Sequence, residues 1–394
     1  MKAWSRAVME VLDLPFLPRF ERLAQIVEYL LAVGKERRIN ICIDECQGLN
    51  SCEPSFLQEL LSAWDRNRKS SKTVLVLVRS GTAAMEARSE DPDRPLDGSV
   101  DCLIVLQPFP LRVEAEILDD YAPNAANDDL LALHVLTGGV VWLIEDLMER
   151  GAIDLSCMAD AVFRSGSKFI MEAEIELANE LHGDASGSRT ILKALAFGKT
   201  KREDLQEELG PVSASGFLSR LEKNCGLIAP QHPVLSPNYR RVRYGIRDRY
   251  LSWWLAFVDG ADALLSQNRY AEMRDAFLAG YETFSVRTLR ECFESILLES
   301  RRFREVGSWW DRRGLNEIDI VAVSDAEILL FEVKHSESNF NPVRLARKAQ
   351  AFLEVNPMLQ TLPVRLASLT LADLRKSAKE IIEKARASGF PYEP

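Results

Sequence analysis

Two short apolar runs in the first 120 residues predict strands of a parallel sheet. INICIDE (39–45) and TVLVLVRSGT (73–82) are apolar at consecutive positions, which is typical of strands covered on both faces. A helical pattern at 54–69 separates them, and VDCLIVLQPF (100–109) supplies a third candidate strand. Helices that alternate with strands predict an α/β fold for residues 1–120.

The pattern then becomes helical, and it predicts two further modules. Gly138 and Gly139 are expected to end one helix and begin another inside residues 121–185, which reads as a lid-like helical subdomain. Residues 186–258 contain three short helical segments, two of them closed by glycine, and Ser213 or Ser215 is a plausible N-cap for the third. Two strand-like arms around a proline-rich turn follow, and this order predicts a winged helix.

Arginines crowd the predicted wing and the segment after it. Arg240, Arg241, Arg243, Arg247 and Arg249 could contact DNA phosphates if they lie on an exposed face. The structural alternatives are a solvated charged face or ion pairs with acidic residues of the N-terminal half. The sequence leaves DNA contact and domain coupling open as roles for this module.

The last region, residues 259–394, contains linker helices and then the strongest chemical pattern of the chain. LNEIDIVAVSDAEILLFEVKHSE (315–337) predicts two apolar strands joined by a tight polar turn. Antiparallel pairing around that turn places Asp319 beside Glu332, and Lys334 shares their face because side chains alternate with period two. The same register pairs two further positions, Val323 with Ile328 and Val321 with Leu330.

Two carboxylates and an ammonium on one face suit phosphate chemistry. Asp319 and Glu332 supply the oxygen ligands that magnesium prefers, and Lys334 could position or help to deprotonate an attacking water. Glu294, on the amphipathic segment 290–300, is a possible further ligand. The alternative is a hairpin whose polar face meets solvent, since a D…ExK pattern is common by chance.

A second pair of acids, Asp44 and Glu45, ends the first apolar run. Acids at the carboxyl end of a parallel strand suit a magnesium ion and a water beside a nucleotide phosphate. Such a site needs a phosphate loop of the form GxxxxGK[ST], and none precedes Asp44. AVGKER (32–37) and LAFGKT (195–200) match it only in part, and the latter is interpreted as the end of a helix.

Taken together, ICIDE, LVLVRSGT, TGGVVWLIE, YGIRDRYLSWWLAFV and EIDIVAV…LLFEVKHS resemble the archaeal-type AAA+ ATPase family, which also occurs in bacteria. The resemblance spans nearly the whole chain. It implies ATP and magnesium as cofactors, with Asp44 as the Walker B acid on the magnesium side and Glu45 as the acid that polarises the hydrolytic water. Ser80 or Thr82 would be the sensor residue.

The C-terminal domain of that family has a PD-(D/E)XK restriction-endonuclease-like core and unknown function. The resemblance matches Asp319, Glu332 and Lys334 to the nuclease-like motif, and Glu294 less closely to its helix acid. Because the family places its phosphate loop well before Walker B, we expect the chain to begin after that loop. The expected fold is an incomplete P-loop AAA+ sheet with impaired ATP binding, and a homo-oligomer is a further expectation because such relatives often form rings.

Composition narrows these expectations only slightly. The chain has 394 residues, 47% of them hydrophobic and 27% charged, which is typical of a globular protein of about two to four domains. Without a long apolar stretch or a secretory signal, we expect no membrane span and a cytoplasmic location. Seven scattered cysteines and four histidines without metal spacing argue against disulfides and structural zinc, and a net charge of −10 opposes nonspecific DNA binding by the whole chain. The hypotheses are an ATP-dependent switch, a magnesium-dependent nuclease, and a DNA-binding or partner-binding scaffold.

Overall fold

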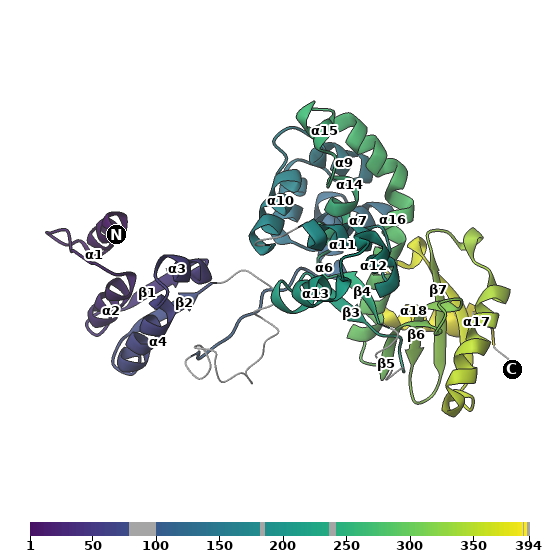
Figure 1. Cartoon of the computed structure of the whole chain (residues 1–394). Helices are drawn as coiled ribbons and strands as arrows, with labels where there is room; N and C mark the ends of the chain where they lie inside the picture. The colour runs from purple at the N-terminus through teal and green to yellow at the C-terminus, as the bar shows by residue number, and fades with distance from the viewer. Residues whose placement is uncertain (79–99, 182–185, 236–241, 389, 392–394) are drawn as a thin grey trace. The chain divides into compact units, whose positions relative to one another are not determined.

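The protein forms two compact units, residues Met1–Leu106 and Gln107–Pro394. The computed structural model describes residues 1–78, 100–181, 186–235, 242–388 and 390–391 (Figure 1). Among these residues, no helix is both long enough and apolar enough to cross a membrane.

The first unit is built around a two-stranded parallel sheet. Ile41 and Ile43 of the first strand point into a core that contains Leu31, Leu60 and Trp64 from the flanking helices. A parallel pair needs a crossover connection, and a helical segment supplies it here. The elements are α1 (Lys2–Leu12), α2 (Leu23–Val33), β1 (Ile39–Ile43), α3 (Cys46–Cys52), α4 (Phe56–Asn67) and β2 (Thr73–Leu77).

Only one face of this sheet is covered by the described residues. Val74, Val76 and Val78 are 43%, 44% and 41% exposed, although their continuous apolar run predicted burial on both faces. The third predicted strand, at 100–109, is also wrong. Its residues adopt no regular secondary structure, and Leu103 and Ile104 are each 74% exposed. An apolar run is a strand only where a partner strand is available, and none of the described strands pairs with this run.

The second unit begins with helices, as predicted. Gly138 and Gly139 separate two of them with positive φ angles of 59° and 83°, and a Cβ on Gly139 would lie 2.3 Å from the carbonyl oxygen of Phe109. Only glycine fits both constraints. The helices are α6 (Leu111–Tyr121), α7 (Asn127–Thr137), α8 (Val141–Glu149), α9 (Leu155–Val162) and α10 (Lys168–Glu180).

Residues 186–258 contain the predicted order of three helices and a two-stranded antiparallel ribbon. Ser213 caps the third helix, because its side chain accepts a hydrogen bond from the backbone N–H of Ser215. The segment GKT at 198–200 follows the first helix and is not a phosphate loop. The elements are α11 (Ser186–Ala196), α12 (Arg202–Leu209), α13 (Ala214–Ser219), the π-helical η1 (Arg220–Asn224), β3 (Ile228–Gln231) and β4 (Arg243–Ile246).

A mixed sheet closes the chain, in the order β5-β6-β7-β8-β9. Its first three strands are antiparallel, β7 and β8 are parallel across a helical connection, and β9 is antiparallel to β8. The elements are α14 (Arg249–Phe257), α15 (Asp262–Ser266), α16 (Tyr270–Glu299), β5 (Glu305–Trp310), β6 (Glu317–Val323), β7 (Ile328–Lys334), η3 (Glu337–Asn339), α17 (Pro342–Val355), η4 (Pro357–Leu359), β8 (Val364–Thr370), η5 (Leu371–Asp373), α18 (Ala378–Ser388) and β9 (Phe390–Pro391).

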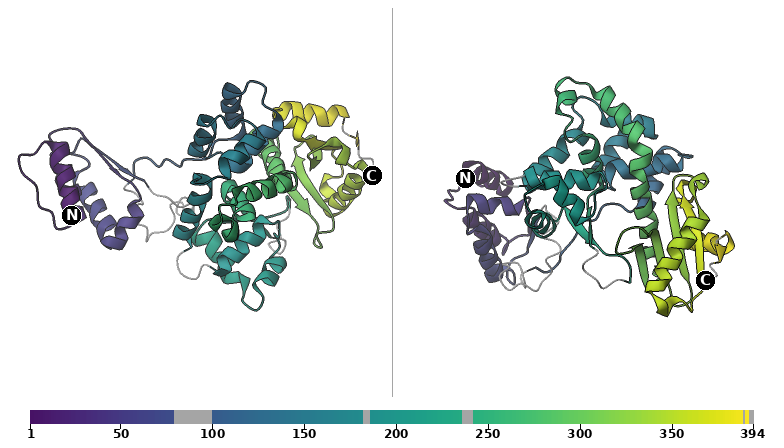
Figure 2. Two further views of the ribbon diagram at one scale, coloured as in Figure 1. Left: turned by 90° about the horizontal axis from the view of Figure 1, so that it is seen from above. Right: turned by 45° about the vertical axis from the view of Figure 1, so that its right-hand side comes forward.

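The two faces of this sheet enter different cores. Val321, Val323 and Leu330 pack in one cluster with apolar residues of α17. Ile320 and Phe331, on the opposite face, belong to the larger core that includes α16 and α18 (Figures 1 and 2). The alternation of β6 and β7 therefore determines which polar side chains lie on the α17 side and which lie on the α16 side.

Candidate functional site

The β6–β7 hairpin has the register that the sequence predicted. Val323 pairs with Ile328 and Val321 with Leu330, and the antiparallel ladder reaches Ile320 and Phe331. The Ser324 hydroxyl fixes the turn by accepting hydrogen bonds from the backbone N–H groups of Ala326 and Glu327. Asp319, Glu332 and Lys334 continue the α17 side of the two strands beyond this ladder.

Asp319 lies where the ladder ends, and hydrogen bonds hold it on two sides. Its Oδ2 accepts a hydrogen bond of 2.8 Å from the backbone N–H of Val333. Its carbonyl oxygen accepts another from Ser308 Oγ of β5, also at 2.8 Å. β7 therefore fixes the carboxylate of Asp319, and β5 fixes its backbone.

Glu332 lies close to two lysines from different elements. Its Oε1 is 3.2 Å from Nζ of Lys334 and 3.4 Å from Nζ of Lys348, which belongs to α17. Glu332 is only 3% exposed, and its Oε2 is buried without a hydrogen-bond partner among the described residues. A buried carboxylate oxygen without a partner is costly, so it marks a position where a ligand could supply the missing interaction.

The electrostatics link the two carboxylates through the same lysines. Burial raises the pKa of the Asp319 carboxyl above its ordinary value. The hydrogen bond from Val333 opposes that rise, as do the positive charges of Lys334 and Lys348. A carboxylate pair that shares two ammonium groups in a desolvated site is typical of functional positions.

Asp319 and Glu332 are the residues of this set that could hold a metal ion such as magnesium. Asp319 and Glu332 provide the hard oxygen donors, and the buried Oε2 of Glu332 has no competing partner. Within the described residues, no group of three or more histidine, cysteine or acidic side chains is placed to hold a metal by itself.

Glu294 is not part of this cluster, contrary to the prediction from the sequence that it is a further ligand. It lies on α16, whose apolar residues pack in the core on the opposite face of the sheet. Its carboxylate lines a different groove, beside β5. The amphipathic pattern of 290–300 predicted the helix correctly but could not show which sheet face the helix covers.

In the first unit, Asp44 and Glu45 follow β1 as predicted. Both are exposed, and Asp44 Oδ1 accepts a hydrogen bond from the backbone N–H of Glu45 at 3.0 Å. Glu45 has a left-handed backbone, with φ 48° and ψ 44°, at the sharp turn from β1 into α3. Non-glycine residues adopt this conformation at a cost, and such residues cluster at functional turns. The proposed sensor residues, Ser80 and Thr82, lie outside the described residues.

Among the arginines expected to contact DNA, Arg240 and Arg241 lie outside the described residues, and Arg243 contacts the C-terminal sheet. Arg243 Nη1 is 2.9 Å from Glu317 Oε1, and its guanidinium lies 4.3 Å from the centre of the Trp310 ring. Its side chain is only 12% exposed. Arg243 therefore forms an ion pair, but with Glu317 of β6 and not with an acidic residue of the N-terminal half, as the alternative had it.

Two residues of the site were missed from the sequence. Lys348 lies on the buried stripe of α17 with Leu345, Ala349 and Phe352, and it is only 8% exposed. A lysine within an apolar helical stripe was the available signal. Arg290 of α16 donates from Nη1 to Ser308 Oγ at 3.2 Å and thereby connects to Asp319 through Ser308. No sequence pattern marked this connection.

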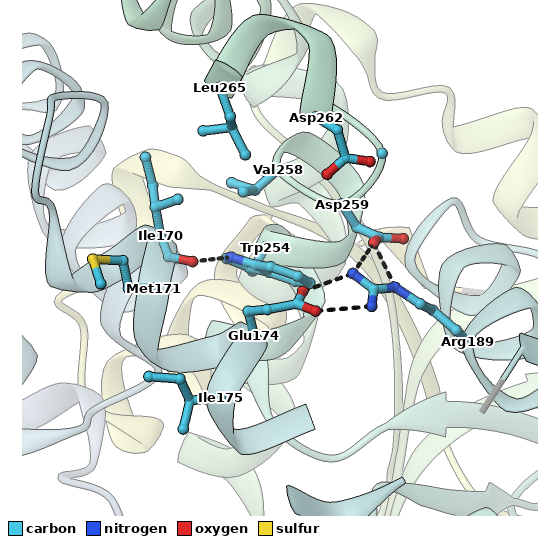
Figure 3. A pocket seen from close by; sticks show the side chains of 11 residues that line it. Ile170, Met171, Glu174, Ile175, Arg189, Trp254, Val258, Asp259, Asp262 and Leu265 are labelled. Carbon is cyan, nitrogen blue, oxygen red and sulfur yellow. Dashed lines mark hydrogen bonds and ion pairs between the residues drawn. The ribbon is translucent and has the colours of Figure 1, made fainter. Parts of the chain in front are cut away.

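A separate groove of about 590 Å³ lies between α10, α14 and α15 (Figure 3). Arg189 crosses one end of it and forms ion pairs with Glu174 and Asp259. Trp254 forms an apolar wall, and its indole N–H donates to the carbonyl oxygen of Ile170 at 2.9 Å. Because both carboxylates already bind Arg189, the polar groups at that end satisfy one another.

The chain is similar to archaeal and bacterial proteins of unknown function. A family model with the description "Archaea bacterial proteins of unknown function", DUF234, matches residues 254–346, which include Asp319, Glu332 and Lys334. The uncharacterized protein MJECL04 of Methanocaldococcus jannaschii is 22% identical over 346 residues, which cover 81% of this chain and 74% of that protein. No solved structure matches the chain.

Proposed function

We propose that the C-terminal domain is a magnesium-dependent phosphodiester hydrolase whose site is formed by Asp319, Glu332 and Lys334. The observation that carries this proposal is the unequal environment of the two Glu332 oxygens. Oε1 contacts two lysines, whereas Oε2 is buried and has no hydrogen-bond partner in the part of the chain that the structure describes. A structural ion pair would gain from satisfying both oxygens, so the free oxygen supports a ligand-binding role.

The acidic residues of the site would bind the metal ion, and Lys334 would contact the phosphate. Asp319 and Glu332 would hold the magnesium ion, which polarises a phosphoryl oxygen and lowers the pKa of a bound water. Lys334 is 32% exposed at its side chain, so its ammonium can reach a substrate oxygen or an attacking water. Lys348 is nearly buried and acts through Glu332, which it orients.

Position in the sheet supports the same assignment. Glu332 and Lys334 lie at the carboxyl end of β7, which is parallel to β8. Ligands of parallel strands bind outside their carboxyl ends. The polar face of a hairpin exposed to solvent, the alternative reading, is disfavoured because Glu332 is 3% exposed.

The test is hydrolysis of labelled single-stranded and double-stranded DNA and RNA with magnesium. Asp319→Asn and Lys334→Met should each lower the rate by about 10²-fold or more, because each removes a charge placed at the reacting phosphate. Lys379→Met, on the exposed surface of α18, is the matched control and should retain the wild-type rate. Equal rates in all four proteins, or no cleavage of any substrate by the wild type, would refute the proposal.

Residues 1–106 support a second candidate function, the binding of a nucleotide with magnesium. The specific observation is the left-handed turn at Glu45, which follows the carboxyl end of β1 and directs two acids to one edge of the parallel sheet. Calorimetric titration of the chain with ATP and magnesium tests this function. Binding that is lost in Asp44→Ala would support it, and a titration without heat would count against it.

A further inference from the structure

A second groove, here called the Arg290 groove, lies beside the edge strand β5 and has a volume of about 610 Å³. Its polar lining comes from Gln231 at the end of β3, His232 after it, Arg290 and Glu294 of α16, and Glu305 and Ser308 of β5. Its apolar lining includes Val234, Val306 and Trp310. A groove of this size, with apolar walls and a few convergent polar groups, has the features of a small-molecule site.

Two polar groups of this groove have donors or acceptors that no other described residue satisfies. Arg290 uses Nη1 on Ser308, but its Nε is buried without a hydrogen-bond partner within the described ranges. Glu294 is half-buried, and no hydrogen bond or ion pair joins it to another described residue. Burial raises the pKa of the Glu294 carboxyl, and the charge of Arg290 only partly opposes that rise.

The spacing of these groups defines the ligand that would satisfy them. Arg290 and Glu294 are four residues apart on α16, so they project from the same helix face one turn apart. Arg290 offers donors, whereas Glu294 and the exposed Glu305 offer acceptors. The two carboxylates would repel an anion, and the guanidinium would repel a cation. The complementary ligand is therefore neutral and carries both an acceptor and donors.

We propose that the Arg290 groove binds a guanine base. The base edge of guanine carries one acceptor, O6, next to the N1–H and the 2-amino donors. Arginine is a common partner of guanine O6, and carboxylates accept from base amino groups. The apolar walls of Val234 and Val306 suit the faces of a planar ring, and Trp310, whose ring already carries the Arg243 guanidinium, lines the groove beside them. The groove adjoins the proposed hydrolytic cluster, because Ser308 lines the groove and also bonds the Asp319 carbonyl oxygen, but guanosine binding does not depend on hydrolysis.

The test is calorimetric titration of the full chain with guanosine, inosine and adenosine. Guanosine should bind at least tenfold more tightly than inosine, which lacks the 2-amino donor, and more tightly than adenosine. Glu294→Gln should weaken guanosine binding at least tenfold. Glu299→Gln, an exposed acid on the same helix, is the matched control and should leave binding unchanged.

Equal affinity of the wild type for the three nucleosides, or no binding of guanosine, overturns the proposal without the use of any variant. An unchanged guanosine affinity in a folded Glu294→Gln protein also overturns it. Titration with a single-stranded trinucleotide that has guanine between two thymines shows whether the groove prefers a base within a strand or a free nucleoside. Tighter binding of the trinucleotide than of guanosine assigns the groove to a base within a strand, and equal binding assigns it to a free nucleoside.

Discussion

Replacing Lys348 by methionine, alone and together with Glu332→Gln, tests whether the buried charges at the hairpin act as a pair. The two charged atoms are 3.4 Å apart, and their side chains are 10% and 4% exposed. With an effective dielectric constant of about 20, two unit charges at this distance attract by about 5 kcal/mol. Desolvation of both groups offsets much of this attraction, so the net contribution of the pair is far smaller.

The expected change in the free energy of unfolding depends on which charges remain buried in each variant. Removal of one partner of a buried pair costs about 3–5 kcal/mol, because the other charge remains desolvated. In Lys348→Met, Glu332 keeps Lys334 at 3.2 Å, so we expect a loss of about 2–4 kcal/mol in the free energy of unfolding. The double variant leaves neither charge of the pair, so it should cost less than the sum of the two single variants by about 1.5 kcal/mol or more.

Urea unfolding followed by tryptophan fluorescence measures these free energies, since Trp309 and Trp310 lie in the same sheet. The control is Lys379→Met, whose partner Glu383 is 3.8 Å away on an exposed surface, and its effect should stay within about 0.5 kcal/mol. If the two single costs add to within about 0.5 kcal/mol, Lys348 does not orient Glu332.

Three further predictions concern charges elsewhere in the second unit. Asp319→Asn should raise the melting temperature at neutral pH, because burial raises the pKa of Asp319 and so penalises its ionised form in the folded state. Thermal scans at decreasing pH should show the difference in melting temperature from the wild type vanish as the carboxyl becomes protonated. Arg243→Ala should lower the free energy of unfolding by about 1.5–3 kcal/mol, since it removes a charge-assisted bond to Glu317, and an effect near zero in urea unfolding would argue against that contact. His134→Gln should flatten the loss of stability between about pH 6.5 and 10. Burial lowers the pKa of His134, but Cys292 and Glu114 outweigh this effect and raise the pKa to about 10, so the wild type loses stability at up to about 1.4 kcal/mol per pH unit as the pH rises through that window. Equal pH profiles of the free energy of unfolding in the two proteins would contradict this assignment.

Features set by neighbouring residues could be predicted from the sequence. The Ser324 turn and the pairing of Val323 with Ile328 are correct because one polar turn fixes the register of both strands. The break at Gly138 and the cap at Ser213 are also correct, since each depends on a single backbone conformation or a local hydrogen bond.

Features that depend on residues far apart in the sequence could not be predicted from it. Lys348 reaches Glu332 across 16 residues of sequence, and only the packing of α17 on the sheet brings them together. Glu294 was expected near Asp319, but the choice of sheet face by α16 depends on the whole core of the second unit. The run at 100–109 is apolar enough for a strand, yet no described strand pairs with it.

The contact of Arg243 shows that the partner of a charged side chain could not be predicted from the sequence either. A basic wing predicts a phosphate contact or a salt bridge equally well, because composition does not specify a partner. Glu317 lies 74 residues later in the sequence, and only the folded arrangement, which brings β4 to the start of β6, makes it the partner. Charge patterns therefore indicated where interactions occur but not with which group.

The most direct test of the central claim is the binding of a divalent cation at Asp319 and Glu332. Titration of the chain with manganese, followed by electron paramagnetic resonance of the free ion, measures the number of sites and their affinity. The account predicts that both Asp319→Asn and Glu332→Gln lose one manganese site that the wild type and Glu299→Gln retain. Identical titration curves for all four proteins would contradict it.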